Sequence, residues 1–125
     1  MGRDKNNNKE KKVKIVFTAK GENWDSLVDA RFGRMEVLVI YDEISDTLRS
    51  ITNSQTESME HGAGLQTAQK VLELNPDVII TGNGAGQKAL DILKRSNVKM
   101  YIGAGDMTIK DAYEAYKNDK LPLQF

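Results

Sequence analysis

The 125-residue chain contains no cysteine, a single histidine and only two prolines. Without cysteine it can form no disulfide, no thiolate nucleophile and no metal cluster held by cysteine ligands. One histidine alone cannot complete the ligand set of a zinc site. No apolar run approaches the roughly 20 residues of a membrane helix, and the polar start of the chain does not match a secretory signal. We therefore expect a cytoplasmic protein that neither spans nor enters a membrane.

The net charge at pH 7 is zero, but the charges are unevenly distributed. Residues 1–12 carry an excess of three positive charges, and residues 13–125 carry an equal negative excess. A slightly acidic body argues against a nucleic-acid partner, which would select a basic surface. The polar composition of residues 1–12 predicts a disordered tail, and residues 13–125 have the length of one domain with its own core.

Five short apolar runs, each bounded by polar or turn residues, predict five β-strands. They cover residues 13–18, 36–42, 47–53, 78–81 and 99–102. The fourth run is apolar at successive positions, which is typical of a parallel strand buried on both faces. The second and third runs are separated by only a few polar residues and therefore predict an antiparallel hairpin. Helical spacing of apolar residues follows the third, fourth and fifth runs.

This order of elements predicts an α/β fold with three layers. The first three strands form a meander, and the fourth must lie beside the first to bury its apolar run. The mixed five-stranded sheet then has the order 3-2-1-4-5, with the second strand antiparallel to the others. Right-handed crossovers place the first two helices on one face of the sheet and the last helix on the other.

Three glycine-rich corners precede the predicted helices: HGAG at 61–64, GNGAG at 82–86 and GAG at 103–105. In the predicted topology they share one edge of the sheet with the DARFGR loop at 29–34, because the strands before them all end there. Ligands of open α/β sheets bind at the carboxyl ends of the strands. Helix N-termini at this edge would offer free N–H groups and a partial positive charge to an anion. The glycines could equally serve only to shape the turns.

The residues at this edge form a candidate anion site. Arg31 and Arg34 would supply positive charge, and His61 would supply a metal ligand or a proton near neutral pH. Backbone N–H groups would come from five glycines: Gly62, Gly64, Gly82, Gly84 and Gly103. A lone histidine beside a helix start can also be a surface residue without a ligand role. No nucleophile–base constellation or carboxylate cluster can be assigned, so no catalytic residue is predicted.

Several segments together resemble the dinitrogenase iron–molybdenum cofactor biosynthesis family. They are KIVFTA at 14–19, DARFGR at 29–34, HGAG at 61–64, DVIITGNGAGQKAL at 77–90 and YIGAGDMTIKDAYEAYKNDKL at 101–121. The resemblance spans nearly the whole predicted domain and depends on the order and spacing of these motifs. It implies a ribonuclease-H-like fold with the sheet order 3-2-1-4-5. It also implies a protein that binds or carries iron–molybdenum cofactor, or its iron–sulfur precursor, without being an enzyme.

The resemblance further implies which residues would contact the cofactor. The family's Asp-x-(Arg/His)-Phe-Gly-Arg segment is matched by Asp29, Arg31, Phe32, Gly33 and Arg34. His61 and Gly62 match a position at which members often have histidine or cysteine before glycine. Because this chain has no cysteine, His61 is the one metal ligand that the resemblance implies. Charge and backbone N–H groups would hold the rest of the cluster.

The sequence supports three functional hypotheses. The first is a non-catalytic binding or carrier protein for an anionic metal cofactor, an iron–molybdenum or iron–sulfur cluster bound as cargo, with cofactor-biosynthesis proteins as partners. The second is an enzyme or sensor that binds a phosphorylated metabolite or nucleotide at the same edge. The third is a protein-interaction module that uses the exposed edge of the third strand. We expect a monomer or a weak homodimer.

Overall fold

The computed structural model describes residues 11–53 and 62–125, so that His61 and most of the predicted tail lie outside the described residues. Five strands and three helices lie within the described part, in the predicted sequence order. Their bounds are β1 (Lys14–Ala19), β2 (Val37–Asp42), β3 (Thr47–Thr52), α2 (Ala63–Glu73), β4 (Val78–Ile80), α3 (Gln87–Lys94), β5 (Lys99–Tyr101) and α4 (Ile109–Lys117). Among these helices, none combines the length and the apolar composition that crossing a membrane requires.

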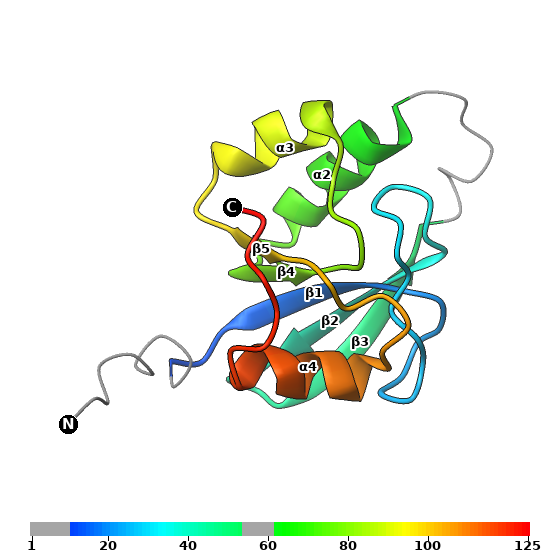
Figure 1. The fold of residues 1–125 in the computed structure, drawn as a ribbon, viewed down its shortest axis with the longest axis vertical. Helices are drawn as coiled ribbons and strands as arrows, with labels where there is room; N and C mark the ends of the chain where they lie inside the picture. The colour runs from blue at the N-terminus through cyan, green and yellow to red at the C-terminus, as the bar shows by residue number, and fades with distance from the viewer. Residues whose placement is uncertain (1–10, 54–61) are drawn as a thin grey trace.

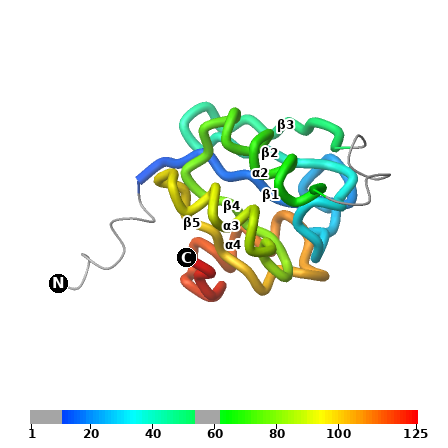
Figure 2. The backbone as a smooth tube through the Cα atoms, turned by 90° about the horizontal axis from the view of Figure 1, so that it is seen from above, coloured from blue at the N-terminus to red at the C-terminus, as the bar shows by residue number. Residues whose placement is uncertain are grey.

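The sheet has the order β3-β2-β1-β4-β5, which confirms the predicted strand order. β2 is antiparallel to both β1 and β3, whereas β4 pairs in parallel with β1 and with β5. Figure 1 shows α2 and α3 covering one face of the sheet and α4 covering the other. Figure 2, viewed from the side of α2 and α3, shows these two helices over the strands. The layered α/β architecture is therefore as predicted, while its assignment to the ribonuclease-H-like folds stays a prediction.

The two faces of the sheet carry separate hydrophobic cores. Ile15 and Phe17 of β1 belong to the core beneath α4, and Val16 belongs to the core beneath α2 and α3. All three side chains are fully buried. A strand covered on both faces has no solvent side, so it forms an unbroken apolar run in the sequence. β1 and its parallel neighbour β4 thus form the centre of the domain.

Two buried threonines mark the carboxyl ends of β1 and β4. The hydroxyl oxygens of Thr18 and Thr81 are 2.7 Å apart. The Thr18 hydroxyl donates to the Asp29 carbonyl at 2.8 Å, so Thr81 is the donor to Thr18. The N–H of Asp29 donates in turn to the Thr18 carbonyl at 2.8 Å. These bonds anchor the start of the DARFGR loop at the edge of the sheet where the parallel strands end.

The two edges of the described sheet differ. β3 forms one edge. Along the other edge, residues 122–125 run beside β5, with an antiparallel bridge between Tyr101 and Leu123. Figure 1 shows this red segment of the chain passing close to β5. No strand was predicted at residues 122–125.

Candidate functional site

The DARFGR loop lies directly against the start of α2. Gly33 has φ of +117°, and a Cβ atom added there would lie 2.8 Å from both the Cα and the N atom of Gly64. Only glycine permits this approach of two backbone segments together with a positive φ. The loop and the described residues 62–64 of the HGAG corner therefore lie on the same edge of the sheet, as the sequence predicts.

The other two glycine corners meet the same loop. A Cβ atom on Gly82 would lie 2.5 Å from the Cα of Ala30 and 3.1 Å from the Cα of Gly105. The N–H of Asn83 donates to the Ala30 carbonyl at 2.8 Å, and the N–H of Gly103 donates to the Gly82 carbonyl at 2.8 Å. The loop at 29–34 and the corners at 82–86 and 103–105 thus form one continuous backbone surface.

A buried side-chain network holds the loop against α2. The Asn53 amide nitrogen donates to the Met35 carbonyl at 3.2 Å, and the Thr67 hydroxyl of α2 donates to the Gly33 carbonyl at 3.4 Å. Lys70, also on α2, donates to the Asn53 side-chain oxygen at 3.0 Å. Both Asn53 and Thr67 are fully buried. Because buried polar groups are costly when unpaired, this network fixes the position of α2 against the loop.

A pocket of about 240 Å³ opens between the first turns of α2 and α3. It is lined by Gly62, Gly64, Leu65, Gly86, Gln87, Lys88 and Ala89. Gly62 and Gly86 are the N-caps of the two helices, and neither cap makes a side-chain hydrogen bond. The carbonyls of these two caps accept the first intrahelical bonds, each at 2.9 Å. The N–H groups of the first turn of each helix therefore have no partner within the helix.

This lining gives the pocket an electropositive character. Each helix N-terminus is equivalent to about half of a positive charge, and here two of them face one pocket. Lys88, in the first turn of α3, adds a full positive charge to the lining. The N-terminus of α4 is different, because the Thr108 side chain accepts a hydrogen bond from the N–H of Asp111 at 3.0 Å. The α2–α3 pocket is thus the place in the described chain best suited to an anion.

The predicted glycines separate into two groups in the structure. Gly62 and Gly64 line the α2–α3 pocket. Gly82, Gly84 and Gly103 do not line it, and each lies where another segment of the chain crosses closely. The first group lies at helix starts, whereas the second leaves room for the backbone of Ala30 and for the side chains of Gln124 and Pro122.

Arg31 is paired with an acidic residue of its own loop. Its Nε donates to Asp29 Oδ1 at 3.1 Å and its Nη2 donates to Asp29 Oδ2 at 2.9 Å. The Asp29 side chain is only 2% exposed, whereas that of Arg31 is 57% exposed. Burial alone would raise the pKa of Asp29, but the hydrogen bonds and charge of Arg31, together with the charge of Lys20, outweigh it and lower this pKa. The negative charge of Asp29 thus offsets much of the positive charge of Arg31. Arg34, on the same loop, is half-buried.

Replacing Asp29 by asparagine is expected to lower the free energy of unfolding near pH 7 by about 1–2 kcal/mol, because Arg31 loses its charged acceptor. The folded pKa of Asp29 lies below its unfolded value, so this contribution is present above about pH 4 and is lost as the pH falls through the folded pKa. Urea denaturation from about pH 2 to pH 7 should show a difference that disappears in acid. The exposed Asp25→Asn variant is the control, and a difference that stays constant with pH would contradict the role of this charge.

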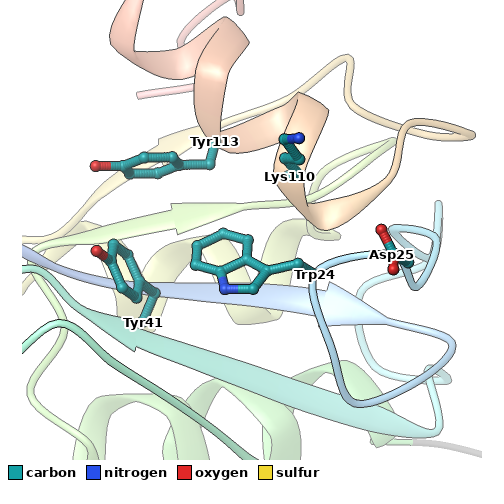
Figure 3. A pocket seen from close by; sticks show the side chains of 5 residues that line it. All are labelled: Trp24, Asp25, Tyr41, Lys110 and Tyr113. Carbon is teal, nitrogen blue, oxygen red and sulfur yellow. The ribbon is translucent and has the colours of Figure 1, made fainter.

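A larger cavity, of about 420 Å³, lies on the α4 face of the sheet. Figure 3 shows the rings of Trp24, Tyr41 and Tyr113 around it, with Asp25 and Lys110 to one side. The ring centroids of Trp24 and Tyr41 are 4.9 Å apart and those of Tyr41 and Tyr113 are 5.3 Å apart, both edge-to-face. The rings therefore pack on one another beside the core beneath α4. Aromatic faces and two opposite charges do not select an anion, so we place the candidate site in the α2–α3 pocket.

A buried carboxylate beneath this aromatic cluster has a structural role. Glu43 accepts hydrogen bonds from the Tyr113 hydroxyl, from Lys117 at 3.0 Å and from the N–H of Val13 at 2.9 Å. Burial alone would raise the pKa of Glu43, but these hydrogen bonds and the charge of Lys117 outweigh it and lower this pKa. Glu43 therefore ties α4 to the start of β1 and to the turn after β2.

Gly86 belongs to the predicted corner at 82–86, but neither it nor Gln87 and Lys88 was among the predicted site residues. These residues could have been predicted from the expected start of the helix. The free N–H groups of a helix belong to its first turn rather than to the residues before it. Within residues 11–53 and 62–125, no group of three or more histidine, cysteine, aspartate or glutamate side chains could hold a metal ion. The described part of the site therefore offers hydrogen-bond donors and positive charge.

The chain matches a family described as dinitrogenase iron–molybdenum cofactor over residues 11–119. The apo form of the orange protein from Desulfovibrio gigas is 29% identical, with a TM-score of 0.82 and coverage of 88% of this chain and 91% of that chain. A NifB-like protein from Thermotoga, solved by NMR, is 28% identical, with a TM-score of 0.74 and coverage of 89% and 92%. The crystal structure of PH0822 is 20% identical, with a TM-score of 0.68 and coverage of 90% and 95%, and supports the fold alone.

A search among curated proteins finds no match. The family match nevertheless includes every described strand and helix, from β1 to α4. The chain therefore belongs to the dinitrogenase iron–molybdenum cofactor family.

Proposed function

We propose that this protein binds an anionic metal–sulfur cofactor, iron–molybdenum cofactor or an iron–sulfur precursor, in the α2–α3 pocket and carries it without catalysis. The family description names the iron–molybdenum cofactor, and one similar structure is NifB-like. The observation that carries the proposal is that the caps and first turns of two helices line one pocket. Helix N-termini arranged in this way form anion sites in many proteins.

The pocket offers hydrogen-bond donors, which suit an anion that is bound through its outer atoms rather than by coordination of its metal ions. Each hydrogen bond to a charged acceptor contributes about 1.5–3 kcal/mol net, so several N–H groups acting together would give useful affinity. The chain has no cysteine that could bind iron directly. His61, which directly precedes the cap Gly62, is the one additional ligand that the sequence offers.

The size of the pocket favours a compact inorganic anion over a nucleotide. Its volume is about 240 Å³. Pockets for drug-sized organic ligands are usually about 300–1,000 Å³. Four of the seven lining residues here are glycines or alanine, which bring the backbone close to the ligand. A small, highly charged cluster, or one charged face of a larger cofactor, matches this volume better than a base and a ribose.

The proposal is tested by anaerobic titration with tetrathiomolybdate, a compact dianion of molybdenum and sulfide, followed by its visible absorption and by co-elution with the protein. We expect saturable binding that weakens as salt is added, because the attraction is electrostatic. Lys88→Ala should weaken binding about fivefold or more, since one charge-assisted hydrogen bond is lost. His61→Ala should weaken it several-fold if the histidine is a ligand, and Lys99→Ala, an exposed lysine outside the pocket, is the control.

The outcomes separate the hypotheses. Failure of the wild-type protein to bind either tetrathiomolybdate or a purified iron–sulfur cluster would overturn the carrier proposal. Tighter binding of a nucleotide than of the metal–sulfur anion would favour the enzyme or sensor hypothesis instead. Binding that ignores His61→Ala but not Lys88→Ala would remove the histidine ligand and leave the pocket of N–H groups.

A further inference from the structure

Residues 122–125, which we call the strap, extend the sheet beyond β5. The N–H of Ile102 donates to the Pro122 carbonyl at 2.9 Å, and the N–H of Gln124 donates to the Met100 carbonyl at 2.7 Å. These are main-chain bonds of an antiparallel pair, and they align the strap with the outer edge of the sheet. The strap therefore has a fixed register relative to the corner at 82–86.

The side chain of Gln124 reaches that corner. The N–H of Ala85 donates to Gln124 Oε1 at 3.3 Å, and Gln124 Nε2 lies 3.5 Å from the Ala85 carbonyl as its donor. The amide group lies directly over Gly84, where an added Cβ atom would meet the three amide atoms at 2.5–2.9 Å. Gly84 also has φ of +91°. A single side chain thus contacts both polar groups of Ala85 and occupies the space that Gly84 leaves open.

These contacts act on the α3 side of the pocket through one peptide group. The Ala85 carbonyl and the Gly86 N–H belong to the same planar unit and point in opposite directions. By holding the carbonyl, Gln124 fixes the direction of the Gly86 N–H. Gly86 is the N-cap of α3 and lines the pocket. The cap has no side-chain hydrogen bond, so the strap constrains the peptide group that leads into it while the first-turn N–H groups stay available.

We infer that Gln124 is a positioning residue for the anion site and that docking of the strap on β5 is coupled to ligand binding in the α2–α3 pocket. This inference rests on the proposed function of that pocket. The α2 side of the pocket is positioned by other contacts, those of Gly33 with Gly64 and the Asn53 hydrogen bonds. The strap carries exposed groups, with the Leu123 side chain 49% exposed, and such edges open locally more readily than a core. Thermodynamic linkage then requires that a ligand which prefers the docked corner also stabilises the docked strap.

The first test is affinity for tetrathiomolybdate. Gln124→Ala should weaken binding about fivefold, because one or two constraining hydrogen bonds are lost. Gln124→Glu keeps an acceptor for the Ala85 N–H but loses the donor to its carbonyl, so it should bind at least as weakly as Gln124→Ala. Leu123→Ser, which leaves the amide and the main chain of the strap in place, is the matched control and should bind like the wild type.

The second test is amide hydrogen exchange at Ile102 and Gln124, the N–H groups that join the strap to β5. Saturating tetrathiomolybdate should slow their exchange in the wild type, and should do so much less in Gln124→Ala. A side chain that only stabilised the fold would change the thermal midpoint without this ligand-dependent protection. Equal affinity in wild type and Gln124→Ala, with equal exchange, would overturn the positioning role. Absence of binding in the wild type would instead overturn the proposed function, and the coupling with it.

Discussion

Replacing Gly82 by alanine is expected to lower the free energy of unfolding by about 3 kcal/mol, at the upper end of the usual cost of overpacking. The added Cβ atom would lie 2.5 Å from the Cα of Ala30 and 3.1 Å from the Cα of Gly105. Both neighbours are backbone atoms, so no side-chain rotation can relieve the contact. The DARFGR loop would have to move away from the corner, breaking the bond from Asn83 to the Ala30 carbonyl.

The matched control lies four residues further along the same turn. No atom lies within 4 Å of a Cβ added to Gly86, and its φ of −75° suits any residue. Gly86→Ala should therefore leave stability unchanged or raise it by about 0.4–1 kcal/mol, through the lower entropy of the unfolded chain. Urea denaturation of the two variants measures the contrast. Equal stability of the Gly82 and Gly86 variants would show that the loop and the corner are not in close contact.

The different roles of Gly82 and Gly86 could not be predicted from the sequence. Gly82 and Gly86 belong to one five-residue motif and cannot be distinguished from the local sequence. Their roles depend on which distant segment crosses each of them: Ala30 lies against Gly82, and nothing lies against Gly86. The motif predicts a turn into a helix, but the tertiary neighbours decide which glycine is a packing requirement and which one faces a pocket.

The sheet order, in contrast, could be predicted because it depends on local sequence patterns. The central run, Val78 to Thr81, has apolar or β-branched residues at successive positions, which requires cover on both faces. The short turn between β2 and β3 permits only a hairpin. Together with the right-handed crossover rule, these features leave one arrangement, and the structure has it.

Two parts of the site needed the structure. The Arg31 side chain is a candidate charge in the sequence, but its acceptor Asp29 is placed against it by a loop conformation that the sequence alone does not reveal. The strap has the sequence Pro-Leu-Gln-Phe, which is too short to show a strand pattern, and it pairs only with the short edge strand β5. Its partner Ala85 is distant in sequence, so no local pattern could indicate the contact.

Gly86→Asp is expected to have the largest effect on function. The cap position of α3 has extended φ and ψ angles, in which an aspartate side chain accepts hydrogen bonds from the N–H groups of the first turn. The substitution should therefore keep or slightly raise stability, by a few tenths of a kcal/mol relative to glycine. It would also place a negative charge where the anion is proposed to bind. Two unit charges about 4 Å apart near a protein surface interact by about 4 kcal/mol before screening by salt, so the loss of affinity should be large.

The most direct measurement compares the affinity for tetrathiomolybdate of Gly86→Ala, Gly86→Asn and Gly86→Asp at low salt. Alanine leaves the N–H groups free, asparagine occupies them without charge, and aspartate occupies them with a negative charge. The account predicts affinity close to wild type for alanine, weaker binding for asparagine, and binding weaker by about tenfold or more, or about 1.4 kcal/mol, for aspartate than for asparagine. Equal affinity of all three folded variants would contradict an anion site at the paired N-termini of α2 and α3.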